Sequence, residues 1–290
     1  RYVLKDLSLS VQRGRVYGFI GPNGAGKTTT LRLLMGLLRP THGKALLLGN
    51  DLWTAPPKER QRVAYVSQEA KLHDGMTVEE HAIFFSHLYE KWDEEYASQL
   101  AESFELALDR RVSQLSGGER RKAAILLALA ARPEVLLLDE PAAGLDPIAR
   151  RELMDALVDA LQTGDGLTVL LSTHLLADLE RMAEDVGILD RGRLVRSGSL
   201  EELQAGTCRV QVVFEGVDSV PNGFSLPSAV RSESSGPVFT AVVSPFREEA
   251  LARVHEKHAA RIQTFPLGLE EIFIALLGPG ARQDFGGMEE

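Results

Sequence analysis

The segment from Gly21 to Thr28 combines glycines, a lysine and a threonine in the spacing of a phosphate-binding loop, G-x-x-x-x-G-K-[ST]. Its glycines let the backbone curl until several N–H groups point at a phosphate. Lys27 supplies positive charge for the β and γ phosphates, Thr28 offers a hydroxyl to Mg²⁺, and Thr29 is a further phosphate contact. We therefore expect a nucleotide here, which an ordinary glycine-rich turn would not bind. The expected binding residues are Gly21, Pro22, Asn23, Gly24, Ala25, Gly26, Lys27, Thr28 and Thr29.

Two acids follow an apolar run farther along the chain. Val135–Leu138 shows no polar alternation, which indicates a strand buried on both faces, and Asp139-Glu140 stands at its end. A strand that ends in an acid brings that acid to the edge of the sheet, where phosphates would lie. Asp139 would hold Mg²⁺ through water, and Glu140 would polarise an attacking water molecule. A helix-capping acid pair is the alternative, and the phosphate loop favours the catalytic interpretation.

A glycine-rich helix start occurs at Leu115-Ser116-Gly117-Gly118-Glu119. Ser116 and Glu119 have the S-x-x-E spacing of a capping box, which is a sufficient structural reason for both. A Gly-Gly helix start also leaves bare N–H groups, and such a start attracts anions. Ser116 would then cap the helix and also touch phosphate, together with Gly117 and Gly118. One chain thus carries two phosphate-type sites, whereas a mononucleotide enzyme needs one.

Strands that alternate with helices must position these residues. Apolar runs predict buried strands before the phosphate loop and the acid pair, and helical spacing follows at Leu31–Leu38 and Glu119–Ala131. This alternation predicts an α/β fold with a mainly parallel sheet. With the phosphate loop at 21–28, the expected fold is the core of a phosphate-loop NTPase. Arg191-Gly192 predicts a hairpin, and Asp146-Pro147 predicts a helix start. Strands are expected at Val16–Ile20, Val63–Val66, Val135–Leu138, Thr168–Leu171, Val186–Leu189 and Leu194–Ser197.

Residues 78–108 have a helical pattern that is rich in aromatic side chains. Phe84, Leu88 and Trp92 fall at i, i+4 and i+8, so we expect a buried stripe on one helix. Core packing is the expected role of most aromatic residues in this segment. Other, exposed residues between Gln68 and Leu88 would be available to a partner.

The composition changes near residue 205, which predicts a small α+β domain at 206–278. Its expected core is ordinary apolar packing, and no spacing of residues there indicates catalysis. The tail 279–290 is rich in glycine and is expected to be disordered. The expected elements are strands Cys208–Phe214 and Val238–Val243 and helices Glu248–His258 and Leu269–Leu277.

Charge and composition narrow the possible partners. The 290 residues carry 32 Lys plus Arg and 41 Asp plus Glu, a formal charge of 32 − 41 = −9, which disfavours a nucleic-acid binder. Cys208 is the single cysteine, so no internal disulfide can form, which fits a reducing compartment. The longest apolar run, Ala123–Ala131, is far shorter than a membrane span, and no basic-then-apolar leader opens the chain.

Taken together, the motifs of residues 1–205 resemble the ATP-binding subunit of ABC transporters, with a helical subdomain at about 76–132. Except for the 115–119 signature, none of the motifs is specific to this family by itself. Their combination in this order along one chain is specific. An adenine-stacking aromatic residue normally lies several residues before the segment that resembles Tyr2–Leu7, a region outside this sequence. Tyr2 could take that role, although we expect it to pack on the sheet. The motifs are the phosphate loop 21–28, Gln68 after Tyr65-Val66-Ser67, the signature 115–119, the acidic motif 135–140, Gly144-Leu145-Asp146, and His174 after Ser172-Thr173.

The resemblance implies a mechanism that uses ATP and Mg²⁺. Two subunits, expected to be identical, pack head to tail, and each ATP lies between one phosphate loop and the signature Ser116–Gly118 of the other subunit. Gln68 would join Mg²⁺ and the attacking water to the helical subdomain, and His174 would contact the γ-phosphate and hold Glu140. Asp146 would cross the dimer interface, although it is also a good N-cap before Pro147.

At the level of subgroup, Met76–Glu80, Tyr89–Asp93 and Leu269–Phe273 resemble bacterial exporter ATPases whose membrane permease is a separate protein. This implies a cytoplasmic protein held at the inner face of the membrane by the permease, with a helix of the permease in a groove near Gln68–Leu88. The alternative is a soluble, non-transport ABC-type ATPase. The ribosomal kind usually has two ATPase units, and the DNA-repair kind needs a coiled coil between Lys27 and Ser116, where no sustained heptads occur. A phosphate-loop kinase or GTPase would leave the signature without a role.

Overall fold

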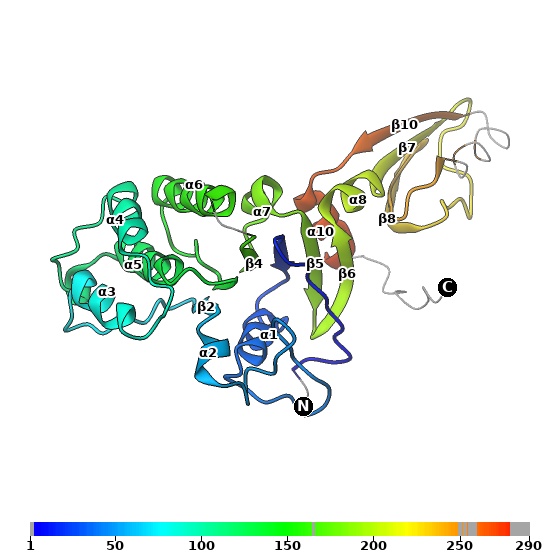
Figure 1. The fold of residues 1–290 in the computed structure, drawn as a ribbon. Coiled ribbons are helices and arrows are strands. Elements are labelled where there is room, and N and C mark those ends of the chain that lie inside the picture. Colours follow the sequence, from blue (N-terminus) through cyan, green and yellow to red (C-terminus); the bar gives the residue numbers. More distant parts are fainter. Residues whose placement is uncertain (1–2, 164–165, 249–250, 252–253, 255–259, 279–290) are drawn as a thin grey trace. The chain divides into compact units, whose positions relative to one another are not determined.

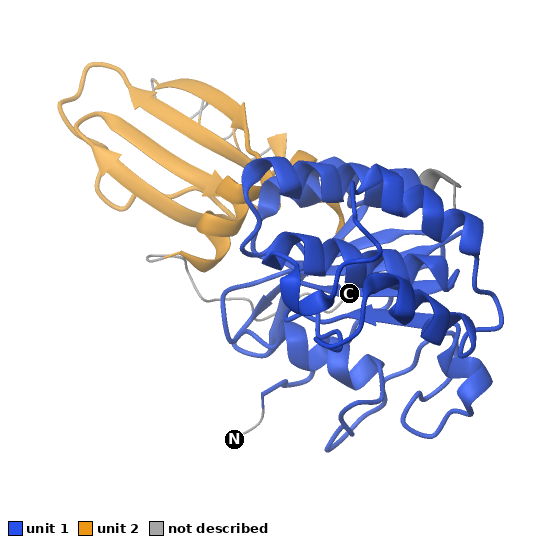
Figure 2. Ribbon diagram, turned by 90° about the vertical axis from the view of Figure 1, so that its left-hand side faces the viewer, with its two compact units in different colours: residues 1–197 blue, residues 198–290 orange. Residues whose placement is uncertain are grey.

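The computed structural model of this chain describes residues 3–163, 166–248, 251, 254 and 260–278. The chain divides into two compact units, residues 1–197 and 198–290, each with its own sheet (Figure 2). The division lies before the predicted domain boundary at residue 205, so α8 (Leu200–Ala205) belongs to the second unit. Most of the predicted helix Glu248–His258, and the whole tail 279–290, fall outside the described residues.

The first unit is built on a six-stranded sheet with the strand order β2-β3-β4-β1-β5-β6. Neighbouring strands from β2 to β5 are parallel, as the alternation of strands and helices predicted. All residues of β1, β3 and β4 are buried, because helices cover both faces of a parallel sheet. The strands are β1 (Val16–Ile20), β2 (Val63–Val66), β3 (Val135–Asp139), β4 (Thr168–Thr173), β5 (Asp185–Asp190) and β6 (Arg193–Ser199).

The parallel pairing brings segments that are far apart in sequence to one edge of the sheet. Ile20 pairs with Thr173 at the ends of β1 and β4, and Asp139 pairs with Ser172 on β3 and β4. The carboxyl ends of parallel strands lie at the same edge, which is where ligands bind in open α/β sheets. The segments that follow β1, β2, β3 and β4 therefore leave the sheet together, and each carries a predicted site residue.

Helices cover the two faces of this sheet, with α1 on one side and α6 and α7 on the other (Figure 1). The first helix begins at Lys27, directly after the phosphate loop, and ends at Leu34 rather than Leu38. Gly36 follows with a φ of 64°, which ends the helix and leaves Leu37 and Leu38 exposed. The helices are α1 (Lys27–Leu34), α2 (Pro57–Arg60), α3 (Val78–Ser86), α4 (Glu94–Ser103), a 3₁₀ turn (Val112–Gln114), α5 (Gly117–Ala130), α6 (Pro147–Thr163) and α7 (Leu176–Met182).

The single helical stripe predicted over residues 78–108 is wrong. Helix α3 ends at Ser86, and Asp93 starts a new helix, α4, by accepting a hydrogen bond from the Tyr96 N–H at 2.9 Å. Phe84 and Leu88 are 54% and 48% exposed. Only Phe84 lies on α3, whereas Leu88 and Trp92 lie in the connection between α3 and α4, so the three residues share no helix face. Apolar spacing alone does not reveal an N-cap inside a helical pattern.

The hairpin predicted at Arg191-Gly192 is present between the neighbouring strands β5 and β6. Both turn residues have positive φ, 47° and 82°, as the favoured two-residue hairpin turn requires. A side chain at Gly192 would lie 2.0 Å from the Val3 carbonyl oxygen, so only glycine fits there.

The second unit has an antiparallel sheet with the strand order β10-β7-β9-β8. Strands β7 and β9 alternate buried and partly exposed residues, which places one apolar face against the core. The sequence predicted these two strands and α10, but not β8 and β10, whose residues are mostly exposed. The elements after α8 are β7 (Cys208–Phe214), β8 (Ala229–Ser235), β9 (Val238–Val243), β10 (Ala260–Pro266) and α10 (Leu269–Leu277).

Candidate functional site

The phosphate loop joins the end of β1 to the start of α1. Gly24 and Gly26 have φ values of 80° and 116°, a conformation that other residues avoid. A Cβ atom at Gly21 would lie 2.3 Å from the Leu189 carbonyl oxygen, so only glycine fits at this position. Ala25 is buried, whereas Pro22 and Asn23 are exposed. The loop therefore turns its backbone toward the open N-terminus of α1, where Gly26 is the N-cap.

Lys27, the first residue of α1, has its ammonium group between the loop and the acidic motif. Its Nζ donates to the Gly21 carbonyl at 2.7 Å and lies 3.3 Å from Oε1 of Glu140. Both charged side chains are buried, with 7% of each exposed. A buried positive charge needs such partners, and phosphate oxygens are chemically equivalent ones.

Asp139 forms the centre of a hydrogen-bond cluster at the end of β3. Its Oδ1 accepts from the Thr28 hydroxyl at 3.0 Å and from the Ser172 hydroxyl at 2.7 Å, and its Oδ2 accepts from the Tyr65 hydroxyl at 3.3 Å. The pKa of Tyr65 is raised, first by burial and then by the Asp139 charge. Sequence reasoning assigned no role to Ser172 or Tyr65, although both lie at strand ends that carry motif residues.

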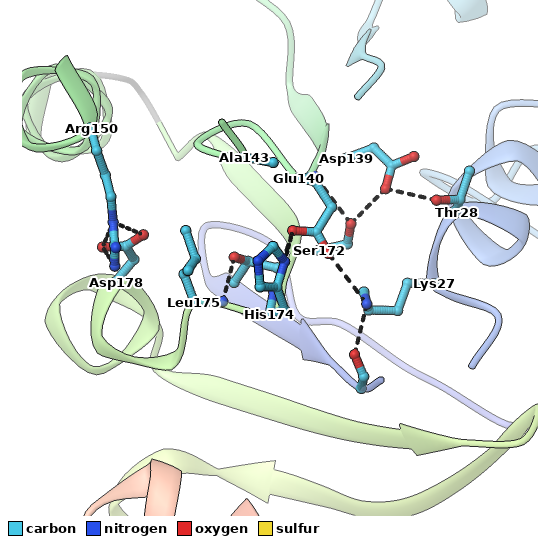
Figure 3. Close-up of polar contacts among 12 residues, drawn as sticks. Lys27, Thr28, Asp139, Glu140, Ala143, Arg150, Ser172, His174, Leu175 and Asp178 are labelled. Atoms are coloured by element: carbon cyan, nitrogen blue, oxygen red, sulfur yellow. Dashed lines mark hydrogen bonds and ion pairs between the residues drawn. The ribbon is translucent and has the colours of Figure 1, made fainter. Parts of the chain in front are cut away.

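Glu140 holds its carboxylate in place through an unusual backbone conformation and two neighbours. Its φ is 50°, a left-handed value that is uncommon for a residue with a side chain, and its N–H donates to the Ser172 carbonyl at 2.9 Å. The His174 Nδ1 lies 2.6 Å from Oε2, opposite the side that faces Lys27. Figure 3 shows Lys27, Glu140 and His174 converging from three different segments. A carboxylate so oriented can polarise a water molecule that attacks a phosphate.

Gln68 lies at the same edge of the sheet, after β2, but its side chain is exposed. Within the described residues, no hydrogen bond or ion pair links that side chain to Asp139 or Glu140. The main chain of Gln68 is nevertheless fixed, because its carbonyl accepts a hydrogen bond from Arg121 at 2.7 Å. The structure thus holds Gln68 near the site without bringing its amide group into the cluster.

The signature segment has the capping box that its spacing predicted. The Ser116 Oγ accepts from the Glu119 N–H at 3.1 Å, and the Ser116 N–H donates to the Glu119 carboxylate at 2.7 Å. The bond from the Ser116 N–H to the carboxylate is the main cause of a lowered pKa of Glu119, and the Arg110 guanidinium adds to it. Ser116 and Gly117 are exposed, and a side chain at Gly117 would meet nothing within 4 Å. The capping box leaves the N–H groups of Gly117 and Gly118 at the start of α5 for an anion.

Asp146 caps α6 in the way that its position before Pro147 predicted. Its Oδ1 accepts from the Ile148 and Ala149 N–H groups, each at 3.0 Å. These backbone bonds, first the one from Ala149, lower the pKa of Asp146. The residue is exposed, and within the described residues no hydrogen bond or ion pair links it to the Asp139 cluster. Its role across a dimer interface stays a prediction.

Two further features bear on metals and membranes. In the described part of the chain, no group of three or more His, Cys, Asp and Glu side chains is arranged to hold a metal ion. An Mg²⁺ ion in a nucleotide site needs fewer protein ligands, because the phosphates and water complete its shell. None of the described helices combines the length and hydrophobicity that crossing a bilayer requires.

Comparison with known proteins gives consistent matches. A family model described as ABC transporter matches residues 4–143. The daunorubicin/doxorubicin resistance ATP-binding protein of Streptomyces peucetius is 35% identical over 94% of this chain and 87% of its own length. The Nod factor export ATP-binding protein I of Cupriavidus metallidurans is 35% identical over 95% of this chain and 92% of its own length.

A solved structure also matches a large part of the chain. It is a dimeric ATP-binding cassette in a post-hydrolysis state, bound to ADP and phosphate. The two proteins are 27% identical, with a TM-score of 0.62 over 69% of this chain and 91% of the cassette. The fold, the order of the motifs and the matched relatives therefore all indicate an ATP-binding protein.

Proposed function

Because this chain belongs to the ABC transporter family as an ATP-binding subunit that hydrolyses ATP, we propose that it powers export by closing a head-to-tail homodimer around two ATP molecules. The observation that carries this proposal is the presence of two anion-binding helix starts with different surroundings. The start of α1 has Lys27, Glu140 and His174 beside it, whereas the start of α5 has an exposed serine and two glycines. One start equips a site for hydrolysis, and the other is suited to complete the site of a second subunit.

In each proposed site, the phosphate loop and the acidic motif of one subunit bind one side of the phosphates. The loop Gly21–Gly26 and the N-terminus of α1 offer backbone N–H groups, and Lys27 adds its charge to the β and γ phosphates. Phosphate oxygens would take the place of Gly21 O and Glu140 as partners of the Lys27 ammonium group. Thr29 follows as a further contact at the start of the same helix.

The donor set at Asp139 fits Mg²⁺. The Thr28 hydroxyl and the Asp139 carboxylate lie 3.0 Å apart at the edge where the phosphates would lie, and hard oxygen ligands of this kind suit that ion. Thr28 would bind the ion directly, Asp139 through water, and Gln68 from its neighbouring loop. When bound, Mg²⁺ neutralises charge on the β and γ phosphates.

Glu140 is the residue that we assign to the attacking water. Its carboxylate accepts the hydrogen bond of the water and directs it in line with the bond to the leaving group, so no covalent intermediate is needed. His174 holds that carboxylate by donating from Nδ1. When the ring carries a proton on both nitrogens, Nε2 can also donate to a γ-phosphate oxygen. Loss of the γ-phosphate removes the contact with the partner's signature segment and opens the dimer.

Export through a separate membrane permease is supported by the relatives whose names record drug resistance and Nod factor export. Ile83, Phe84 and Leu88 form an exposed apolar group after Gln68, with exposed fractions of 54%, 54% and 48%. We propose that a cytoplasmic helix of the permease packs there and holds the subunit at the inner face of the membrane. A soluble role would leave this apolar group without a partner.

The dimer is tested with Glu140→Gln, which keeps the shape of the side chain and removes its charge. We expect this variant to bind MgATP, to lose turnover by orders of magnitude, and to run as a stable dimer in light scattering. The matched control, Glu140→Gln with Lys27→Ala, should remain a monomer at the same ATP concentration. Monomers of Glu140→Gln at saturating MgATP would contradict the proposal.

The composite nature of each site is tested by mixing two inactive variants. Lys27→Ala lacks the phosphate site of its own subunit, and Ser116→Arg blocks the signature that serves the other subunit. A mixed dimer then has one intact site, so mixing should restore part of the MgATP-dependent dimerisation, measured by light scattering, that neither variant shows alone. If each site were contained in one chain, mixing would restore nothing.

A further inference from the structure

Arg121 connects three segments that carry predicted site residues. It lies in the first turns of α5, whose start is the signature segment. One end of its guanidinium, Nη2, donates to the Gln68 carbonyl at 2.7 Å, and the other end, Nη1, donates to the Ala143 carbonyl. Gln68 follows β2 and Ala143 follows β3, so one side chain spans two strand-end loops and a helix.

The contact with Ala143 reaches the loop between the catalytic acid and Asp146. Within this loop the Ala143 N–H donates to the Glu140 carbonyl at 3.1 Å. Asp146 then caps α6 three residues later. A shift of the Ala143 carbonyl therefore moves a short, hydrogen-bonded turn that begins at Glu140. The planar fork of arginine suits this role, because its two ends hold two acceptors in a fixed relation.

The two hydrogen bonds of Arg121 come with a buried polar group that makes no favourable contribution to stability. The Nε of Arg121 is buried and has no hydrogen-bond partner among the described residues. An unpartnered buried donor is destabilising, so the side chain is not optimised for stability alone. The retained group is better explained by the geometry that it imposes on the two loops.

We propose that Arg121 is a positioning residue that couples the two nucleotide sites of the dimer. In the dimer, the start of α5 contacts the γ-phosphate bound by the partner subunit, so closure fixes α5. Arg121 transmits that placement to Gln68 and to the Glu140–Asp146 turn of its own site. Each site thus becomes competent for hydrolysis when the other site is filled, a coupling between two binding sites through one rigid element. The inference rests on the head-to-tail dimer proposed above.

The test compares Arg121→Met with Arg120→Met on the intact protein. Arg120 is the neighbouring residue of α5 and donates to the Val112 carbonyl at 3.1 Å and pairs with Asp74 at 3.2 Å, so it contacts neither loop. We expect Arg121→Met to lower kcat on the order of tenfold to a hundredfold. The KM for ATP should change less than about twofold, and the Hill coefficient should fall from above one to about one. Arg120→Met should leave all three quantities near those of the wild type.

Two further measurements separate this inference from the proposed dimer. Glu140→Gln with Arg121→Met should still dimerise with MgATP, because the binding contacts are intact. In the nucleotide-free protein, hydrogen exchange at Ala143 and Leu145 should be faster in Arg121→Met than in Arg120→Met. A wild-type Hill coefficient of one, or equal kinetics and exchange in the two variants, would overturn the role of Arg121 even if the dimer forms. If Glu140→Gln does not dimerise, the proposed function fails and the coupling role fails with it, whatever the exchange rates.

Discussion

His174 on the segment after β4 contacts Glu140 on the segment after β3, with 2.6 Å between Nδ1 and Oε2. Because this contact orients the proposed catalytic carboxylate, we predict that His174→Ala lowers kcat about 100-fold. The KM for ATP should change little, because Lys27 and the loop backbone bind the phosphates. Steady-state kinetics of the isolated subunit check this. His87→Ala, which removes an exposed histidine of the helical region, is the control and should keep full activity.

The cluster of Thr28 and Asp139 predicts how the activity depends on Mg²⁺. We expect Asp139→Asn to raise the Mg²⁺ concentration for half-maximal ATPase activity at least about tenfold, because a residue that orients metal-bound water loses its charge. Thr28→Ser keeps the hydroxyl and should behave as the wild type. Titration of activity with Mg²⁺ at saturating ATP measures both. Equal Mg²⁺ requirements in Asp139→Asn and the wild type would exclude the assigned role.

Arg150 and Asp178 join the helix after Asp146 to the helix after His174, as Figure 3 shows. The Arg150 Nε and Nη2 donate to the Asp178 carboxylate at 2.7–2.9 Å, and Asp178 is buried. Asp178→Asn leaves a largely buried arginine without its counter-charge. We predict a loss of about 3 kcal/mol in the free energy of unfolding, at the low end for buried pairs because Arg150 is 29% exposed.

Chemical denaturation of full-length protein measures this loss. Asp155→Asn is the matched control, since Asp155 pairs with Arg181 at 2.8 Å but both side chains are about half exposed. That substitution should change stability by less than about 1 kcal/mol. We also expect Asp178→Asn to lower kcat and Asp178→Glu to restore part of it. A similar stability for the two asparagine variants would show that the Arg150 pair contributes no more than a surface pair.

Cys208 at the start of β7 gives a probe of the second unit. Burial raises the pKa of its thiol to about 11, so the thiol stays protonated at pH 8. We predict that iodoacetamide does not label the native protein at pH 8 but labels it fully in denaturant, which mass spectrometry detects at this single cysteine. Because the folded pKa lies above the unfolded value of about 8.5, the stabilising contribution is complete below pH 8.5 and is lost as the pH rises toward 11. Rapid labelling of native protein at pH 8 would contradict the buried position.

Local patterns in the sequence were sufficient for many elements of the fold. The bounds of β1, β2, β7, β9 and α10 match the predicted runs, because each is a short apolar or amphipathic run that ends in a clear signal. The pattern failed over 78–108, where the cap at Asp93 divides a helical segment. The sequence pattern also missed β8 and β10, because their exposed residues do not alternate with buried ones. These two strands form because they pair with β9 and β7, respectively.

For the site, the sequence by itself determined which residue types carry the chemistry. The glycine spacing, Lys27, the acids after Val135–Leu138 and the capping box at Ser116 are properties of local order along the chain. The resemblance implied that His174 holds Glu140, and the structure has that contact. Only the tertiary structure decided that Lys27 pairs with the other oxygen of Glu140, that Ser172 and Tyr65 surround Asp139, and that Arg121 joins Gln68 to Ala143. The physical reason is the strand order β2-β3-β4-β1, since parallel pairing sets which loops become neighbours and no local pattern encodes that order.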